Sequence, residues 1–135
     1  MSAIAGLTFW NFYFRLYPGA VKSPQVVEFV AALVRQIHAP LLIVWDRLAA
    51  HRSGVVRDYL AGLGGQVIVE YLPSYAPELN PVEYIWSYWK QHELPNVCPK
   101  DYWQLGETAR RTLRRMRRRP RLITSFWKQS SLWPE

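Results

Sequence analysis

Two acidic residues stand where their side chains could do chemistry. Asp46 directly follows the apolar run "LLIVW" (41–45), and Glu83 lies in "LPSYAPELNPVEYIW" (72–86), where a proline-rich stretch becomes an aromatic helical pattern. An Asp at the carboxyl end of a buried strand lies at the edge where α/β sheets place their ligand crevice. Two carboxylates that converge in such a crevice either shift a pKa or hold a divalent cation.

Glu83 has two interpretations that the local sequence leaves open. Asn80 is a good N-cap, so Glu83 falls at the third helical position, from which a carboxylate can reach back to the amide of the N-cap. The helix also has an apolar face, which we expect to place Glu83 at its edge, half-buried and in need of a compensating cation. The residues of this expected face are Leu79, Val82, Trp86 and Trp89.

The elements around Asp46 alternate between strand and helix. Residues 3–17 predict a β-hairpin that turns near Trp10, and a helix follows with Ser23 as N-cap. The run 41–45 is continuously apolar, which predicts a strand buried on both faces. Ser53 can cap the next helix, and residues 66–72 predict another strand. The inward residues expected for the helix after Ser53 are Val55, Val56, Tyr59, Leu60 and Leu63.

Between Asp46 and Glu83 lie one helix and one strand, so a strand-end Asp and a helix-borne Glu can reach one crevice. A helix is expected over residues 81–91, and a last one runs from about 101 to 119, where Pro120 ends it before a short tail. The alternation predicts an α/β fold with a parallel portion. Trp45, Trp86 and Trp89 are expected in the core.

The last helix is strongly basic. The chain has a formal net charge of +7, and residues 110–121 hold eight arginines. A solvated charged face is the commonest fate of such a run, but like charges at helical spacing repel, and DNA phosphates would relieve that repulsion. We therefore favour DNA backbone contact without base specificity. The predicted contacts are Arg110, Arg111, Arg114, Arg115, Arg117 and Arg118, and the face opposite them is Ala109, Thr112, Leu113 and Met116.

The stretches "LLIVWDRLAAHRS" and "VEYLPSYAPELNPVEYIWSYWK" together resemble the catalytic domain of mariner-like insertion-sequence transposases, of the DDE superfamily. The resemblance implies an RNase H-like mixed sheet flanked by helices. It covers residues 1–96 as a partial catalytic domain and leaves 97–135 as a C-terminal basic helical extension. It also implies metal-dependent DNA strand cleavage and strand transfer at transposon ends, with a triad of acids that binds Mg²⁺ or Mn²⁺.

Within that resemblance, the second acid matches Asp46 and the third matches Glu83, as catalytic residues and metal ligands. His51 and Asn80 match auxiliary positions: His51 either orients a phosphate or a neighbour or makes a structural hydrogen bond, and Asn80 is most simply the cap. The first acid should lie on the first strand of the sheet, but no Asp or Glu precedes Glu28. We therefore expect that first strand to be missing and the chain alone to be weakly active or inactive.

Several matters stay open at the level of sequence. The chain could come from a truncated gene, a mis-assigned start or one half of a frameshifted enzyme. An alternative function is a non-catalytic DNA-binding or regulatory remnant of a transposase. The expected partners are DNA at transposon ends and targets, and either an upstream transposase segment or a second copy. No membrane span is visible, so we expect a cytoplasmic, nucleoid-associated protein.

Overall fold

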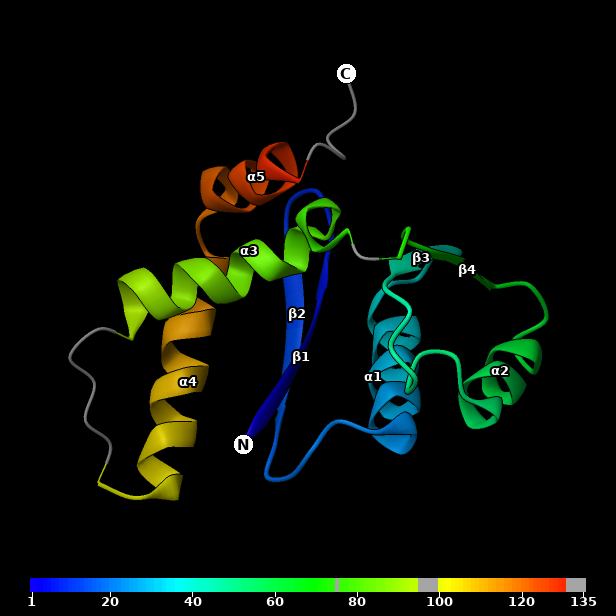
Figure 1. Ribbon diagram of the computed structural model, residues 1–135, viewed down its shortest axis with the longest axis horizontal. Coiled ribbons are helices and arrows are strands. Elements are labelled where there is room, and N and C mark those ends of the chain that lie inside the picture. The colour runs from blue at the N-terminus through cyan, green and yellow to red at the C-terminus, as the bar shows by residue number, and fades with distance from the viewer. Residues whose placement is uncertain (75, 95–99, 131–135) are drawn as a thin grey trace.

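The computed structural model describes residues 1–74, 76–94 and 100–130. A β-hairpin of β1 (Ser2–Leu7) and β2 (Phe12–Tyr17) stands between two helices, α1 (Ser23–Gln36) and α4 (Tyr102–Arg117), as Figure 1 shows. A second strand pair lies beside α1, and α3 crosses above α4. The remaining elements are β3 (Leu41–Trp45), α2 (Gly54–Ala61), β4 (Val67–Tyr71), the 3₁₀ turn η1 (Pro77–Leu79), α3 (Pro81–Tyr88), the π-helical turn η2 (Trp89–Glu93) and α5 (Pro120–Gln129).

The hairpin forms where the sequence predicts it. β1 and β2 pair antiparallel from Ser2 opposite Tyr17 to Leu7 opposite Phe12. The turn is closed by Thr8, whose backbone N–H donates to the carbonyl of Asn11 at 2.8 Å. The side chain of Asn11 in turn accepts from the Phe12 N–H at 2.8 Å. Short polar side chains of this kind stabilise turns by bonding to nearby backbone groups.

The starts of the first two helices agree with the sequence to within one residue. Ser53 caps α2 as expected, because its hydroxyl accepts from the N–H of Val56 at 3.3 Å. The expectation for α1 is wrong: Lys22 is the residue that caps it, and its N–H donates to the side chain of Gln25 at 3.0 Å. Ser23 therefore already lies inside the helix.

β3 and β4 form the expected parallel pair, with Leu41 beside Val67 and Trp45 beside Tyr71. Burial of β3 on both faces, however, is wrong. Ile43 and Trp45 pack toward α1 and α2, while Leu42 is 65 % exposed on the other face. Val44 and Ile68 are exposed there as well, since among the described residues nothing covers that face. Val55 of α2, expected to point inward, is also exposed.

Two apolar clusters form the core, and α1 connects the two strand pairs. α1 packs Val26 and Val30 against β3, while its Phe29 approaches β1 at Gly6. The first cluster joins the hairpin to the C-terminal helices; its buried members are Phe12, Ile85, Leu113, Met116, Leu122, Ile123 and Phe126. The second joins the parallel pair to α1 and α2; its buried members are Val26, Val30, Trp45 and Val56.

The buried face of α3 and the segment after Pro120 both differ from the prediction. The buried residues of α3 are Pro81 and Ile85, while Trp86 and Trp89 are only partly buried against the first cluster. The apolar face is thus rotated from the one expected. Pro120 ends the basic helix as predicted, but it also begins α5, where the sequence predicts only a short tail. Proline is well suited to a first helical turn, where its missing N–H costs no hydrogen bond.

The first cluster gives a test of how the basic helix is attached. Leu113 of α4 is fully buried in the same cluster as Phe12 of the hairpin. Leu113→Ala is expected to lower the free energy of unfolding by about 3 kcal/mol, because it removes buried methyl groups and leaves a cavity. Urea denaturation measures this loss. Leu42→Ala, at a residue that is mostly exposed, is the control and should change stability little; equal effects of the two substitutions would contradict the packing.

Candidate active site

Asp46 follows the last residue of β3, and its carboxylate has two neighbours that can donate hydrogen bonds. The backbone N–H of Leu48 donates to Oδ1 of Asp46 at 3.1 Å. Nδ1 of His51 lies 3.0 Å from the same oxygen. The loop after β3 thus folds back on the Asp46 side chain and holds it at the carboxyl end of the parallel pair, as the sequence predicts for a ligand crevice.

Glu83 lies in the first turn of α3, and the structure removes one of its two interpretations. Asn80 caps α3 through its side chain, which accepts from the N–H of Val82 at 3.2 Å. The N–H of Asn80 donates to the carbonyl of Pro77 at 3.0 Å, so the reciprocal bond from Glu83 is not formed. Glu83 is exposed rather than half-buried, which corrects the expectation that burial alone demands a cation.

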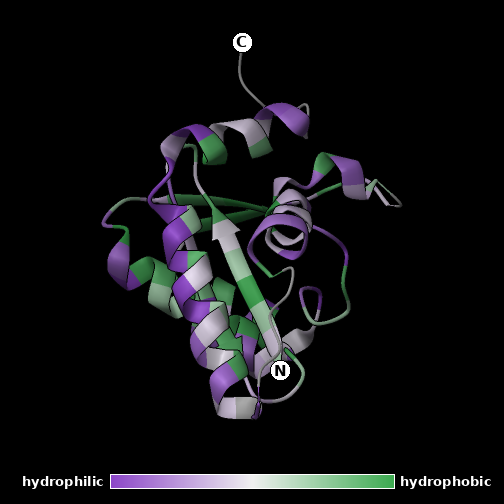
Figure 2. Ribbon diagram, turned by 90° about the vertical axis from the view of Figure 1, so that its left-hand side faces the viewer, coloured by the Kyte–Doolittle hydropathy of each residue, from purple (hydrophilic) through white to green (hydrophobic). Residues whose placement is uncertain are grey.

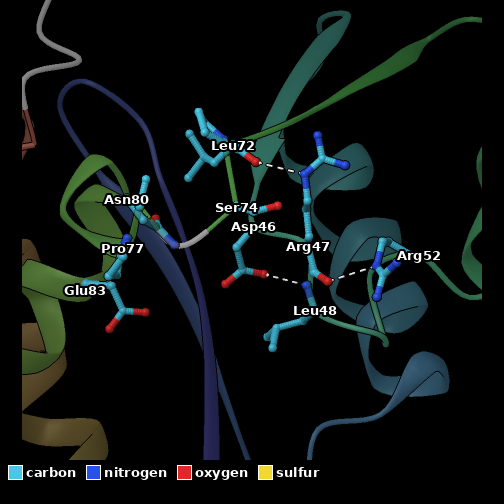
Figure 3. A pocket seen from close by; sticks show the side chains of 11 residues that line it. Asp46, Arg47, Leu48, Arg52, Leu72, Ser74, Pro77, Asn80 and Glu83 are labelled. Atoms are coloured by element: carbon cyan, nitrogen blue, oxygen red, sulfur yellow. Dashed lines mark hydrogen bonds between the residues drawn. The ribbon is translucent and has the colours of Figure 1, made fainter.

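The side chain of Glu83 makes no hydrogen bond or ion pair with any residue that the structure describes. Asp46 and Glu83 both line one cavity of about 430 Å³ between the end of β3 and the start of α3. Figure 3 shows the free oxygen of Asp46 directed toward the side of the cavity where Glu83 lies. Two carboxylates from distant parts of the sequence therefore open onto the same space.

Two arginines at this site were not singled out by the sequence. Arg47 donates through Nε to the carbonyl of Leu72 at 3.2 Å, and Arg52 donates through Nε to the carbonyl of Arg47 at 2.9 Å. Both line the cavity, with their guanidinium groups on the side of Asp46 away from Glu83 (Figure 3). The signal available was the stretch "WDRLAAHRS", in which Arg47 directly follows Asp46 and Arg52 directly follows His51. They brace the loop after β3 and add positive charge to the rim of the cavity.

The donor set suits one hard divalent cation. Carboxylate oxygens are the ligands that Mg²⁺ and Mn²⁺ prefer, and both Asp46 and Glu83 have oxygen atoms facing the cavity. Within the described ranges there is no group of three or more acidic, His or Cys side chains that could hold a metal. Two carboxylates therefore leave most of an octahedral coordination shell to water or to a further ligand.

The arginines of α4 lie on the exposed face that the sequence predicts. Ala109, Thr112, Leu113 and Met116 are all buried. Arg110, Arg111, Arg114, Arg115 and Arg118 are exposed and Arg117 is half-buried. Figure 2, which looks onto the side where α4 lies, shows this helix largely in the colour of hydrophilic residues.

The six predicted DNA contacts are not equivalent, because three of them already have neighbours that use the guanidinium group. Arg110 pairs with Glu107 at 3.3 Å, and Arg117 lies 5.6 Å from the ring centre of Phe14. Arg115 donates to Glu93 through Nε at 3.1 Å and through a second nitrogen. The hydrogen bond and the charge of Glu93 raise the pKa of Arg115 above its ordinary value. Arg111, Arg114 and Arg118 have no such neighbour among the described residues.

A protein-family model described as DDE superfamily endonuclease matches residues 2–105. The chain belongs to this family. Its fold is similar to a solved structure described as the Mos1 transposase catalytic domain with raltegravir and Mn. The two share 16 % sequence identity with a TM-score of 0.62, over 98 % of this chain and 76 % of that one. No curated protein matches the chain.

These comparisons confirm the predicted family and the mixed α/β fold of the RNase H-like type. None of the helices in the described part of the chain is long and apolar enough to cross a bilayer.

Proposed function

We propose that this DDE-family chain carries two of the metal-binding carboxylates of a transposase active site, Asp46 and Glu83. The reaction would be metal-dependent cleavage of a DNA phosphodiester followed by strand transfer at transposon ends. The observation that carries the proposal is that Asp46 and Glu83, from different elements, line one cavity. Glu83 supports it further, because its carboxylate has no described partner and does not serve the cap of α3.

Asp46 and Glu83 would hold Mg²⁺ or Mn²⁺ between the end of β3 and the start of α3. A bound divalent ion would activate a water or 3′-hydroxyl nucleophile and stabilise the charge that develops on the leaving oxygen. The protein's own part is to fix the two carboxylates in place. The Asp46 carboxylate is held by the loop after β3, and Glu83 is placed by the helix that Asn80 caps.

We further propose that an additional strand completes the sheet and brings a third acid. β1 pairs only with β2, and β3 pairs only with β4, among the residues described. α1 packs on both pairs, so the unpaired edges of β1 and β3 are near enough to the same helix for a further strand to join them into one sheet. Such a strand would also add apolar contacts near the exposed Leu42. Its source, an upstream segment or a second copy, is what a reconstitution experiment would decide.

α4 and α5 would form the basic part of the protein and contact the DNA backbone. The arginines of α4 whose guanidinium groups have no described partner are suited to phosphate, and such contacts would make binding strongly dependent on salt. The division into a catalytic part, 1–96, and a basic extension, 97–135, remains our proposal. The two parts share the first apolar cluster, which would fix the arginine face relative to the cavity.

Metal binding by the 135-residue chain tests the proposal directly. In a Mn²⁺ titration followed by electron paramagnetic resonance, we expect weak binding that Asp46→Asn and Glu83→Gln each reduce by about tenfold or more, since each removes a charged ligand. Glu78→Gln is the matched control, because Glu78 is an exposed acid close in sequence that does not line the cavity. Mn²⁺ binding that is insensitive to both substitutions would leave a DNA-binding protein without this catalytic site.

A further inference from the structure

The contacts of Asp46 are divided unequally between its two carboxylate oxygens. The N–H of Leu48 and Nδ1 of His51 both lie within hydrogen-bond distance of Oδ1, at 3.1 and 3.0 Å. Nδ1 of His51 also lies 3.3 Å from the backbone carbonyl oxygen of Asp46. Among the described residues, Oδ2 has no hydrogen-bond partner, and it is the oxygen on the side of Glu83 in Figure 3.

The ring of His51 is held firmly in this position. It stacks on the indole of Trp45, with ring centres 4.4 Å apart and planes at 6°. Trp45 is itself buried in the second cluster, and the side chain of His51 is only 15 % exposed. The hydroxyl of Tyr71 donates to the carbonyl of His51 at 3.5 Å. A core tryptophan and a neighbouring strand thus fix the imidazole against Asp46.

The neighbours of Nδ1 also fix which ring nitrogen carries the proton. Both the carbonyl oxygen and Oδ1 of Asp46 are acceptors, so Nδ1 must be the donor. A donor held 3.0 Å from Oδ1 restricts rotation of the Asp46 side chain. This is how groups behind a metal ligand orient it toward the ion.

We propose that His51 is a positioning residue that, with the amide of Leu48, occupies Oδ1 of Asp46 and so leaves Oδ2 for a divalent cation. Asp46 then binds the ion through one oxygen in a set direction. The part of this inference that concerns the ion rests on the proposed function. The part that concerns the carboxylate does not, because it describes the protein without metal.

Two substitutions separate the hydrogen bond from the stacking. His51→Phe keeps an aromatic ring on Trp45 but has no donor. His51→Asn loses the ring but keeps an N–H at the position of Nδ1, since the same number of bonds separates each nitrogen from Cα. If His51 serves only to pack against Trp45, the Phe variant should behave as the unmodified chain and the Asn variant should be the impaired one.

The first readout uses the metal-free chain. Three-bond NMR couplings of Asp46 report its χ1 angle, and we expect one fixed rotamer in the unmodified chain and in His51→Asn, with averaged values in His51→Phe. A fixed rotamer in His51→Phe overturns the positioning role. Should that variant not fold, long-range ¹⁵N–¹H spectra of the unmodified chain, recorded where only one ring nitrogen carries a proton, still decide the matter: a proton on Nε2 instead of Nδ1 overturns it.

The second readout is the Mn²⁺ titration. We expect His51→Phe to weaken binding by about tenfold and His51→Asn to bind nearly as tightly as the unmodified chain. Averaged couplings in His51→Phe together with no Mn²⁺ binding by the unmodified chain would support the positioning role while contradicting the proposed function. Unchanged Mn²⁺ affinity in His51→Phe would overturn the claim that Oδ2 is reserved for the ion.

Discussion

DNA cleavage should require a third acid, and it should disappear when Asp46 is replaced. The 135-residue chain is expected to cleave nicked or branched DNA with Mn²⁺ only weakly or not at all. The same chain extended at its amino end by a strand that ends in Asp should cleave about a thousandfold faster or more, because each added carboxylate ligand fixes the ion that stabilises the transition state by several kcal/mol. Asp46→Asn in the extended chain should return cleavage to the background level.

The controls for this experiment come from the same acids. An extension whose terminal Asp is replaced by Ala supplies the strand without the carboxylate, and should raise the stability of the chain without raising cleavage. Glu78→Gln should leave the extended chain active, because Glu78 does not line the cavity. Robust cleavage by the 135-residue chain that Asp46→Asn abolishes would show that two carboxylates suffice, and the extension would then be unnecessary.

The second large effect concerns the arginine face of α4. Replacing Arg111, Arg114 and Arg118 together by Gln should lower the slope of log K against log salt concentration by about 2 to 3, because each phosphate contact contributes about 0.9 to that slope. The affinity should fall similarly for all DNA sequences, since phosphate contacts carry no sequence information. Fluorescence anisotropy with duplexes of different sequence, measured over a range of salt concentrations, gives both quantities.

A matched control removes the same charge elsewhere. Lys22, Arg35 and Arg57 are exposed basic residues on or beside α1 and α2, and their joint replacement by Gln should leave the slope nearly unchanged. Arg115 is not included in the test set, because its bond to Glu93 gives it a structural role. If both triple variants lower the slope equally, binding depends on net charge alone and the α4 face has no special part in it.

The sequence predicts where the helices and strands form better than it predicts which of their faces are buried. The hairpin and the caps at Ser53 and Asn80 follow from local turn and capping chemistry, which a few neighbouring residues determine. The parallel pair follows from the alternation of strand and helix along the chain. The exposed face of β3 could not be foreseen in the same way. A continuous apolar run such as 41–45 indicates that both faces are suited to burial, but whether a neighbour covers each face depends on the rest of the assembly.

In the candidate site, too, the sequence identifies single residues but not how the fold packs them together. Asp46 could be singled out because it follows an apolar strand, and Glu83 because it follows a proline-rich cap. That they share a cavity depends on the way α3 packs on the hairpin, and no local pattern records that packing. The burial expected for Glu83 was wrong because the buried face of α3 is centred on Ile85 and not on Val82. The neighbours of Asp46, by contrast, lie within a few residues of it in sequence.

The central claim is that Asp46 and Glu83 bind one divalent ion together. Crystals of the protein grown or soaked with Mn²⁺ test it through anomalous scattering at the manganese edge. Our account predicts a peak within bonding distance of a carboxylate oxygen of each residue, with Oδ2 as the ligand from Asp46. A peak that touches only one of the two carboxylates, or manganese bound elsewhere while this cavity holds none, would contradict it.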